Sequence, residues 1–187
     1  MKKSAPRKKK SKFYIQKHKG RNLHYDFRLE IDGVLKSWAI PKGPSLNPAD
    51  KRLAMLVSDH PLDYGPFEGV IPAGNYGAGP VMLWDSGEYV FVSEARTRKE
   101  TPPADAAEAF QRGALKFVLK GMKCRGRWGL IQMKGRGNAW LLVKDNDDYA
   151  DRNIDFTELM PDSIKTGRSL EEIFQQDQKK NPRYAAS

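Results

Sequence analysis

The 187-residue chain is 39 % hydrophobic and 30 % charged with a net charge of +10, a composition that suits one globular domain with a sizeable core. No run of 18 apolar residues is present, and the basic N-terminus lacks the apolar stretch of a secretory signal, so we expect neither a membrane span nor export. The single cysteine excludes an internal disulfide and a cysteine-based zinc cage, and it fits a reducing cytoplasm.

Two basic segments account for much of the positive charge. Seven of the first twelve residues are Lys or Arg, and we predict a disordered basic arm over residues 1–12. The second segment, residues 120–140, contains no acid and interleaves cations with aromatic and aliphatic residues. Because it lies inside the folded part, we interpret the two segments as an electrostatic footprint for a polyanion, most simply nucleic acid.

Short apolar or alternating runs separated by turn residues follow the arm. They predict strands over 13–18, 23–31, 34–40, 53–58, 80–92, 114–120, 127–134 and 139–144. The dipeptide Asp32-Gly33 is a strong hairpin signal. Residues 66–80 hold four Gly and three Pro, which indicates a long ordered loop.

Only two segments have helix signals. Residues 101–113 begin with a potential N-cap Thr101, followed by prolines and an alanine-rich body, and they end at Gly113. Ser169 and Glu172 have the spacing of a capping box that opens a terminal helix. Many short strands and few helices predict a mainly β fold, an antiparallel barrel or sandwich. We expect a domain over residues 13–160 and a C-terminal helical extension over 161–187.

The stretch "RNLHYDFRLEI" (21–31) alternates almost perfectly between polar and apolar residues. In a strand, the residues at positions 24, 26, 28 and 30 share one face, which presents an imidazole, two carboxylates and a guanidinium. If 13–18 and 23–31 form a hairpin, Gln16 and His18 lie opposite this face. Two neutral histidines and one carboxylate, His18, His24 and Asp26, then suit a divalent transition metal such as manganese, zinc or iron.

Further residues suggest phosphoryl chemistry beside this metal site. His60 lies at the end of an apolar strand and is followed by Tyr64. Arg28 and Arg52 offer planar forks for phosphate oxygens, and Lys42 offers a point charge. A metal can polarise a phosphoryl group, cations can neutralise its charge, and His60 can donate a proton or a hydrogen bond.

Three long stretches, "FYIQKHKGRNLHYDFRLEIDGVLKSWAIPKGPSL", "DHPLDYGPFEGVIPAGNYGAG" and "RGRWGLIQMKGRGNAWLLVK", resemble the phosphoesterase domain of bacterial DNA ligase D over roughly residues 13 to 145. The chain has no ligase or polymerase module, so it looks like a free-standing version or an excised domain. The resemblance implies a β-barrel core and a manganese-dependent enzyme of nonhomologous end joining. Such an enzyme heals 3′ ends in two steps, a phosphodiesterase step that removes a terminal 3′ ribonucleoside and a phosphomonoesterase step that leaves a 3′-hydroxyl.

By motif position, the resemblance assigns roles to nine residues. The manganese ligands would be His18, His24 and Asp26, and the groups around the scissile phosphate would be Arg28, His60 and Tyr64. Further active-site positions are matched by Gln16, Lys42 and Arg52. The chain departs from the family where an acid two positions before the motif histidine is replaced by Ser58, and where "PEGEYG" is replaced by "PAGNYG".

The implied partners are DNA or RNA/DNA primer-template 3′ ends, with Ku, a DNA ligase and a polymerase as candidates. We expect a cytoplasmic, nucleoid-associated monomer. Two alternatives stay open. One is a non-haem iron oxygenase, because His24, Asp26 and the later His60 resemble a facial triad. The other is a non-catalytic nucleic-acid-binding barrel, which would need exposed aromatic residues for stacking.

Overall fold

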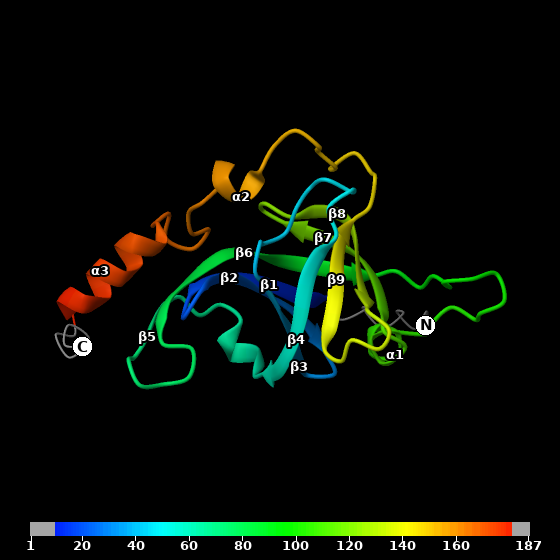
Figure 1. Ribbon diagram of the computed structural model, residues 1–187, viewed down its shortest axis with the longest axis horizontal. Helices are drawn as coiled ribbons and strands as arrows, with labels where there is room; N and C mark the ends of the chain where they lie inside the picture. Colours follow the sequence, from blue (N-terminus) through cyan, green and yellow to red (C-terminus); the bar gives the residue numbers. More distant parts are fainter. Residues whose placement is uncertain (1–9, 181–187) are drawn as a thin grey trace, which may run out of the picture.

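The computed structural model describes residues 10–180, and most of the predicted basic arm therefore lies outside the described residues. The chain forms an antiparallel sheet whose strand order is β1-β2-β3-β4-β9-β8-β7-β6-β5. The strands are β1 (Ser11–Lys19), β2 (Leu23–Ile31), β3 (Val34–Ile40), β4 (Arg52–His60), β5 (Gly69–Ile71), β6 (Gly79–Phe91), β7 (Ala114–Gly121), β8 (Arg125–Gln132) and β9 (Ala139–Lys144). Because β1 also pairs with β6, eight strands close into a barrel and β5 extends β6 on the outside (Figure 1).

The predicted strands are found within two residues of their expected ends, so the mainly β prediction and the barrel are confirmed. The β2–β3 hairpin turns at Asp32 and Gly33, whose φ angles of 51° and 77° are those of a type I′ turn. The short strand β5 lies inside the predicted loop. Its three residues pair with β6, but the surrounding Gly and Pro give the sequence no strand pattern there.

Three α-helices accompany the barrel in the described part of the chain, namely α1 (Ala106–Gln111), α2 (Phe156–Leu159) and α3 (Leu170–Lys180), together with one 3₁₀ turn, η1 (Leu62–Tyr64). None of them is long and apolar enough to cross a membrane. α3 begins after the predicted capping box, because Ser169 and Glu172 exchange backbone-to-side-chain hydrogen bonds. The division into a barrel domain and a C-terminal extension stays a prediction.

The N-cap of α1 is Asp105, so the assignment to Thr101 was wrong. The Asp105 carboxylate accepts from the Glu108 amide, whereas Thr101 precedes two prolines that disfavour helical backbone. Residues 92–105, which precede α1, form an exposed loop that extends from the side of the barrel opposite β5 (Figure 1).

Aromatic residues dominate the barrel core. Phe27 on β2 packs against Trp38 on β3 and Phe117 on β7, and Trp38 packs edge-to-face on Trp140 of β9. All four side chains are at most 1 % exposed. The apolar parity of β2 therefore faces the interior, and the polar parity faces the outside of the barrel.

The outside of β1 and β2 is covered by residues 61–78, which here are called the covering loop. This loop runs from the end of β4 through η1 and β5 to the start of β6. Its position is fixed in turn by the C-terminal segment. The side chain of Glu68 is 1 % exposed and accepts from Ser163, Thr166 and Arg168, while Asp177 of α3 accepts from the amide of Val70.

Candidate functional site

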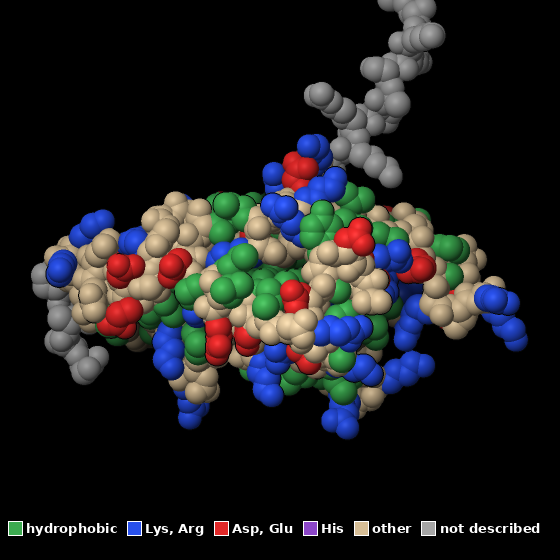
Figure 2. Space-filling view, turned by 90° about the horizontal axis from the view of Figure 1, so that it is seen from above, with side chains coloured by type: hydrophobic (Ala, Val, Ile, Leu, Met, Phe, Trp, Pro, Cys, Tyr) green, Lys and Arg blue, Asp and Glu red, His purple; other side chains and the backbone are tan. Residues whose placement is uncertain are grey.

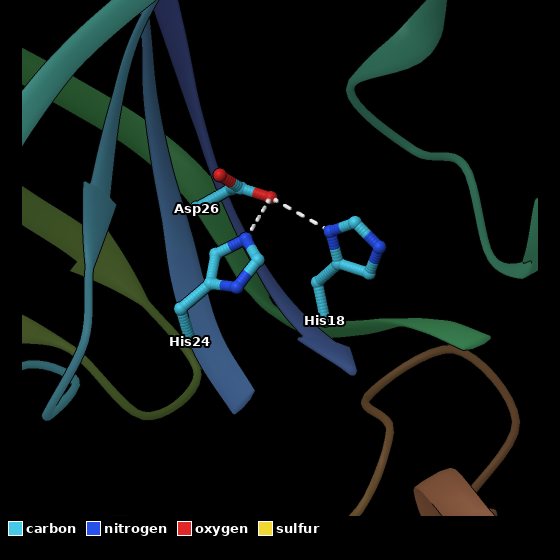
Figure 3. A group of neighbouring side chains, drawn as sticks. All are labelled: His18, His24 and Asp26. Atoms are coloured by element: carbon cyan, nitrogen blue, oxygen red, sulfur yellow. Dashed lines mark ion pairs between the residues drawn. The ribbon is translucent and has the colours of Figure 1, made fainter. Parts of the chain in front are cut away.

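The β1–β2 hairpin brings two histidines and an aspartate together. In the register of the pair, His18 lies opposite His24 and Gln16 opposite Asp26, as the hairpin hypothesis required. His18 Nδ1 lies 3.5 Å and His24 Nε2 lies 3.4 Å from the same oxygen, Asp26 Oδ2, and the three side chains converge from adjacent strands (Figure 3). One donor atom from each lies within 4.8 Å of the others, which is the spacing of ligands around one metal ion.

Backbone carbonyls fix which nitrogen of each histidine faces Asp26. His18 Nε2 lies 2.7 Å from the Gly77 carbonyl, and His24 Nδ1 lies 3.0 Å from the Asn22 carbonyl. Because a carbonyl oxygen only accepts, each of these nitrogens carries the proton in the neutral ring. The other two nitrogens, His18 Nδ1 and His24 Nε2, face Asp26: they are lone-pair donors in the neutral rings, and they donate a hydrogen bond to the carboxylate when the ring is protonated. Backbone carbonyls commonly impose this orientation on metal-binding histidines.

Asp26 is ionised in this environment. Burial by itself would raise its pKa, but hydrogen bonding with His18 and His24 and the charge of Arg28 outweigh this effect and hold the pKa well below its usual range. The hydrogen bond with Asp26 in turn raises the pKa of His24. The residues thus supply two imidazoles and one carboxylate, a donor set that fits a divalent transition metal.

Arg28 joins this cluster to a second group of side chains. It is 2 % exposed, and its Nη2 lies 3.4 Å from Asp26 Oδ2. Its Nε donates to Gln16 Oε1 and its Nη1 to Ser37 Oγ, each at 2.8 Å. Burial lowers the pKa of Arg28, yet a guanidinium starts so high that it stays charged. A positive charge is therefore held in one fixed orientation beside the metal-type cluster.

His60 and Tyr64 complete the second group. His60 Nδ1 lies 3.0 Å from Arg28 Nη1, which can only donate, and 3.0 Å from the Ser58 carbonyl, which can only accept. In the tautomer in which Nδ1 accepts from Arg28, Nε2 carries the proton of the neutral ring. Burial, followed by the charge of Arg28, lowers the pKa of His60, so the ring is neutral at pH 7. Tyr64 stacks on His60 with ring centroids 5.0 Å apart, and the Arg28 guanidinium lies 5.1 Å from the Tyr64 ring centre.

Gln16 is wholly occupied by protein contacts. Its side chain is buried, and its Nε2 lies 3.1 Å from the Tyr64 and Phe67 carbonyls and 3.3 Å from the Gly65 carbonyl. Its oxygen accepts from Arg28. Gln16 therefore holds the covering loop and the arginine in register, and it is a positioning residue.

Lys42 and Arg52 lie apart from the other seven residues. They line a cavity of about 600 Å³ together with Lys17, Tyr25 and Thr157. Tyr25 and His24 are neighbours on β2 and point to opposite faces, so the cavity lies behind the strand that carries the metal-type ligands. Arg52 is at the far end of β4 from His60 and pairs with Asp50 at 3.5 Å.

Sequence reasoning missed three contributors to the site. Ser37 takes one arm of Arg28, and the carbonyls of Asn22 and Gly77 orient the two histidines. Ser37 had a signal, since it lies opposite Arg28 once β2 and β3 are paired as a hairpin. The carbonyl of Gly77 had none, because its contact depends on how the covering loop folds back over β1.

Fold and site together define a β-barrel protein with a two-histidine, one-carboxylate cluster beside a buried arginine, a histidine and a tyrosine. Residues 16–132 match the family model described as the DNA Ligase D 3′-phosphoesterase domain. The chain belongs to this family, which confirms the resemblance seen in the sequence.

Similar proteins include the "Multifunctional non-homologous end joining protein LigD" of Pseudomonas aeruginosa, which is 48 % identical over 164 residues, 85 % of this chain. A protein of the same name from Mycolicibacterium smegmatis is 42 % identical over 80 % of this chain. The "Multifunctional non-homologous end joining DNA repair protein LigD" of Mycobacterium tuberculosis is 40 % identical over 80 % of this chain. The aligned parts make up 18 %, 19 % and 18 % of these relatives, so the chain spans about a fifth of their length.

Proposed function

We propose that this protein is a metal-dependent phosphoesterase that heals DNA 3′ ends. It would remove a terminal 3′ ribonucleoside in a phosphodiesterase step and then convert the 3′-phosphate to a 3′-hydroxyl in a phosphomonoesterase step. The observation that carries the proposal is the direct contact between two groups, the metal-type cluster and the arginine group. They meet where Arg28 Nη2 lies 3.4 Å from Asp26 Oδ2, as a phosphate bound to both would require.

His18, His24 and Asp26 would hold the metal, for which we propose Mn²⁺, with other divalent transition metals as substitutes. Two imidazoles and one carboxylate leave open coordination positions, and the ligand nitrogens already face the carboxylate. When bound, the metal supplies Lewis-acid polarisation of a phosphoryl oxygen or an activated water.

The protein groups would divide the remaining work. Arg28 cannot turn away, because Gln16 and Ser37 hold two of its nitrogens, so its charge stays aimed at the phosphate that develops negative charge. With Nδ1 accepting from Arg28, the Nε2 proton of neutral His60 would be available to the leaving oxygen. The Tyr64 hydroxyl, whose pKa burial raises, stays protonated and would donate a hydrogen bond to the bound phosphate. Lys42 and Arg52 would bind the substrate strand away from the reacting phosphate.

The substrates would be DNA or RNA/DNA primer-template 3′ ends in repair by nonhomologous end joining. The names of the similar LigD proteins place those proteins in this pathway. Ku, a DNA ligase and a polymerase would be the partners, and the site of action would be the cytoplasm at the nucleoid. A net charge of +10 supports a nucleic-acid substrate.

An end-healing assay tests the proposal. A 5′-labelled primer-template ending in a 3′-ribonucleotide or a 3′-phosphate is incubated with the protein and Mn²⁺ or with EDTA. We expect metal-dependent conversion to a 3′-hydroxyl end, and no change at either end would refute the enzyme hypothesis.

Asp26→Asn tests the cluster within the same assay. The amide keeps the shape but not the charge, and we expect activity to fall by more than about 100-fold, beyond the loss typical of an outer-shell partner. The matched control is Asp32→Asn, since Asp32 is exposed and asparagine tolerates its φ of 51°. Equal activity of the two variants would remove Asp26 from the ligand set.

The iron-oxygenase alternative relied on His24, Asp26 and His60 as a facial triad, and these three residues do not form the cluster with ligand spacing. Among residues 10–180, the side chains with ligand spacing are His18, His24 and Asp26, while His60 is engaged by Arg28 through Nδ1. A buried arginine in contact with the carboxylate ligand favours a phosphate substrate. Oxygen consumption with ferrous iron and 2-oxoglutarate would distinguish the two chemistries.

A further inference from the structure

The tip of the covering loop, residues 72–78, is a hydrogen-bonded turn that contacts the metal-type cluster. It connects β5 to β6, whose pairing ends at Ile71 and Gly79. Two backbone hydrogen bonds order it, from the Asn75 amide to the Pro72 carbonyl and from the Ala78 amide to the Asn75 carbonyl. In Figure 1 this tip and the β1–β2 turn lie at the same end of the molecule.

The loop tip is anchored to a metal-type ligand. The carbonyl of Gly77 accepts from His18 Nε2 at 2.7 Å. A Cβ at Gly77 would lie 3.3 Å from the His18 ring, and one at Gly79 would lie 2.0 Å from the Lys19 carbonyl. Since φ is 75° and 133° at these glycines, the backbone approaches β1 as closely as only glycine allows. The residue before Gly77 is thus held beside the cluster.

That residue is Tyr76, whose side chain is fully exposed at 102 % of its reference area. No other tyrosine, tryptophan or phenylalanine in residues 10–180 is as exposed, and Tyr149 follows at 52 %. Single exposed apolar residues are ordinary on protein surfaces. Tyr76 differs because its neighbour's carbonyl contacts a metal-type ligand, so this exposed aromatic ring belongs to a loop that touches the cluster.

The facing β1–β2 turn adds a positive charge. A Cβ at Gly20 would lie 3.4 Å from the His18 ring and 3.8 Å from the Ala78 carbonyl, so this turn and the loop tip are neighbours. Arg21 follows on the turn and is exposed. An aromatic face and a nearby cation are the elements with which proteins bind single-stranded nucleic acid without reading its sequence.

The face of the molecule shown in Figure 2 offers a less focused charge. On the face shown in Figure 2, Lys and Arg side chains are spread out and alternate with Asp and Glu, and no histidine is visible. A diffuse charge of this kind attracts a polyanion but does not orient its end. The end must be placed by groups beside the cluster.

We infer that Tyr76 is the stacking platform for the nucleobase next to the reacting phosphate. The inference rests on the proposed function and adds to it the residue that grips the unpaired end. A base displaced from its duplex would lie against the ring, while its phosphate reaches Arg28 and the histidine cluster. Because every base has a π face, this grip tolerates any sequence, as an end-repair enzyme needs.

The test combines Tyr76 variants with abasic substrates. We expect Tyr76→Ala to lower kcat/KM on a 3′-ribonucleotide end by about 5- to 150-fold, and Tyr76→Phe to retain it. Substrates with an abasic residue at the terminal or the penultimate position locate the contact. With one of these two abasic substrates, the wild type should react only as fast as Tyr76→Ala does on the intact substrate. Tyr76→Ala itself should react no more slowly on that abasic substrate than on the intact one. An alanine variant as fast as the wild type, or one equally impaired on all substrates, would overturn the inference.

A binding measurement separates this inference from the proposed function. An oligonucleotide with 2-aminopurine at its 3′ end is titrated with the protein in EDTA, where no turnover is expected. We expect fluorescence quenching that Tyr76→Leu abolishes and that the matched control Tyr149→Ala preserves. If the wild type heals no 3′ end but the Tyr76-dependent quenching persists, the proposed reaction fails and the stacking contact stands. Quenching that survives in Tyr76→Leu refutes the stacking contact alone.

Discussion

Replacing Glu68 by glutamine should detach the C-terminal segment from the covering loop. Each carboxylate oxygen of Glu68 serves two donors. Oε2 accepts from the Leu83 amide and the Ser163 hydroxyl, and Oε1 accepts from the Thr166 hydroxyl and Arg168 Nη2. Glutamine keeps one oxygen and replaces the other by an NH₂ group, which cannot accept.

The magnitude follows from this geometry. Whichever way the amide is turned, its NH₂ group faces one hydroxyl, which can turn and accept, and one group that can only donate, either a backbone N–H or an arginine. A hydrogen bond to a charged group contributes about 1.5–3 kcal/mol, so losing the bond from the group that can only donate costs about 1.5–3 kcal/mol. For a domain of this size, about 2–4 °C of Tm per kcal/mol gives a decrease of about 3–12 °C.

Thermal melting and amide hydrogen exchange provide the assay. Besides the lower Tm, we expect faster exchange at the amides of Val70 and Ile164, which bond to Asp177 and to the Leu83 carbonyl across the same contact. The control is Glu172→Gln, an exposed carboxylate of the neighbouring capping box, for which we expect a small shift. If Glu68→Gln melts with the wild type and exchange is unchanged at both amides, the reasoning about the brace is wrong.

Three further changes test other contacts. The pKa of Asp26 is lower in the folded protein than its unfolded value of 3.8, so its carboxylate stabilises the fold fully above that pH and less as the pH falls below it. Between pH 5 and 2, the metal-free wild type should therefore lose resistance to urea more steeply than Asp26→Asn. Parallel curves for the two proteins would contradict this. Gly65→Ala places a Cβ 2.4 Å from the Tyr14 ring and should cost about 1–3 kcal/mol in urea unfolding, partly rescued by Tyr14→Leu; no rescue would locate the strain elsewhere. Lys144→Met leaves Asp147 and two carbonyls without their buried donor and should cost about 3–5 kcal/mol, and an unchanged unfolding midpoint would refute the pair's importance.

The metal-type cluster was accessible from the sequence because it is local. His18, His24 and Asp26 fall within nine residues, and one hairpin with a strong turn pattern sets their register. A shift by one residue would bury the polar parity in the aromatic core, so the alternation of β2 leaves a single acceptable pairing.

The second half of the site depends on long-range packing that periodicity does not reveal. Arg28 meets His60 across 32 positions, and it is buried only because the covering loop closes over the outer face of β2. Strand patterns assign such a face to solvent, since loops leave no period to read. Gln16 was predicted as an active-site residue from the resemblance. Because its contacts with Tyr64 and Phe67 depend on how the covering loop folds, only the structure reveals that it holds them in place.

The loop at residues 92–105 offers a practical handle. It extends from the side of the barrel opposite β5, and its base is tied by the Ser93 hydroxyl donating to the Pro103 carbonyl and by an ion pair between Glu94 and Arg127. Exposed loop tips accept insertions and labels with little loss of stability. A dye on a cysteine introduced at Lys99 would report rotational diffusion of the whole barrel without touching Tyr76 or the histidines, and the native thiol of Cys124 is buried and would not compete. The protein thus provides its own attachment point for anisotropy titrations with unlabelled DNA ends.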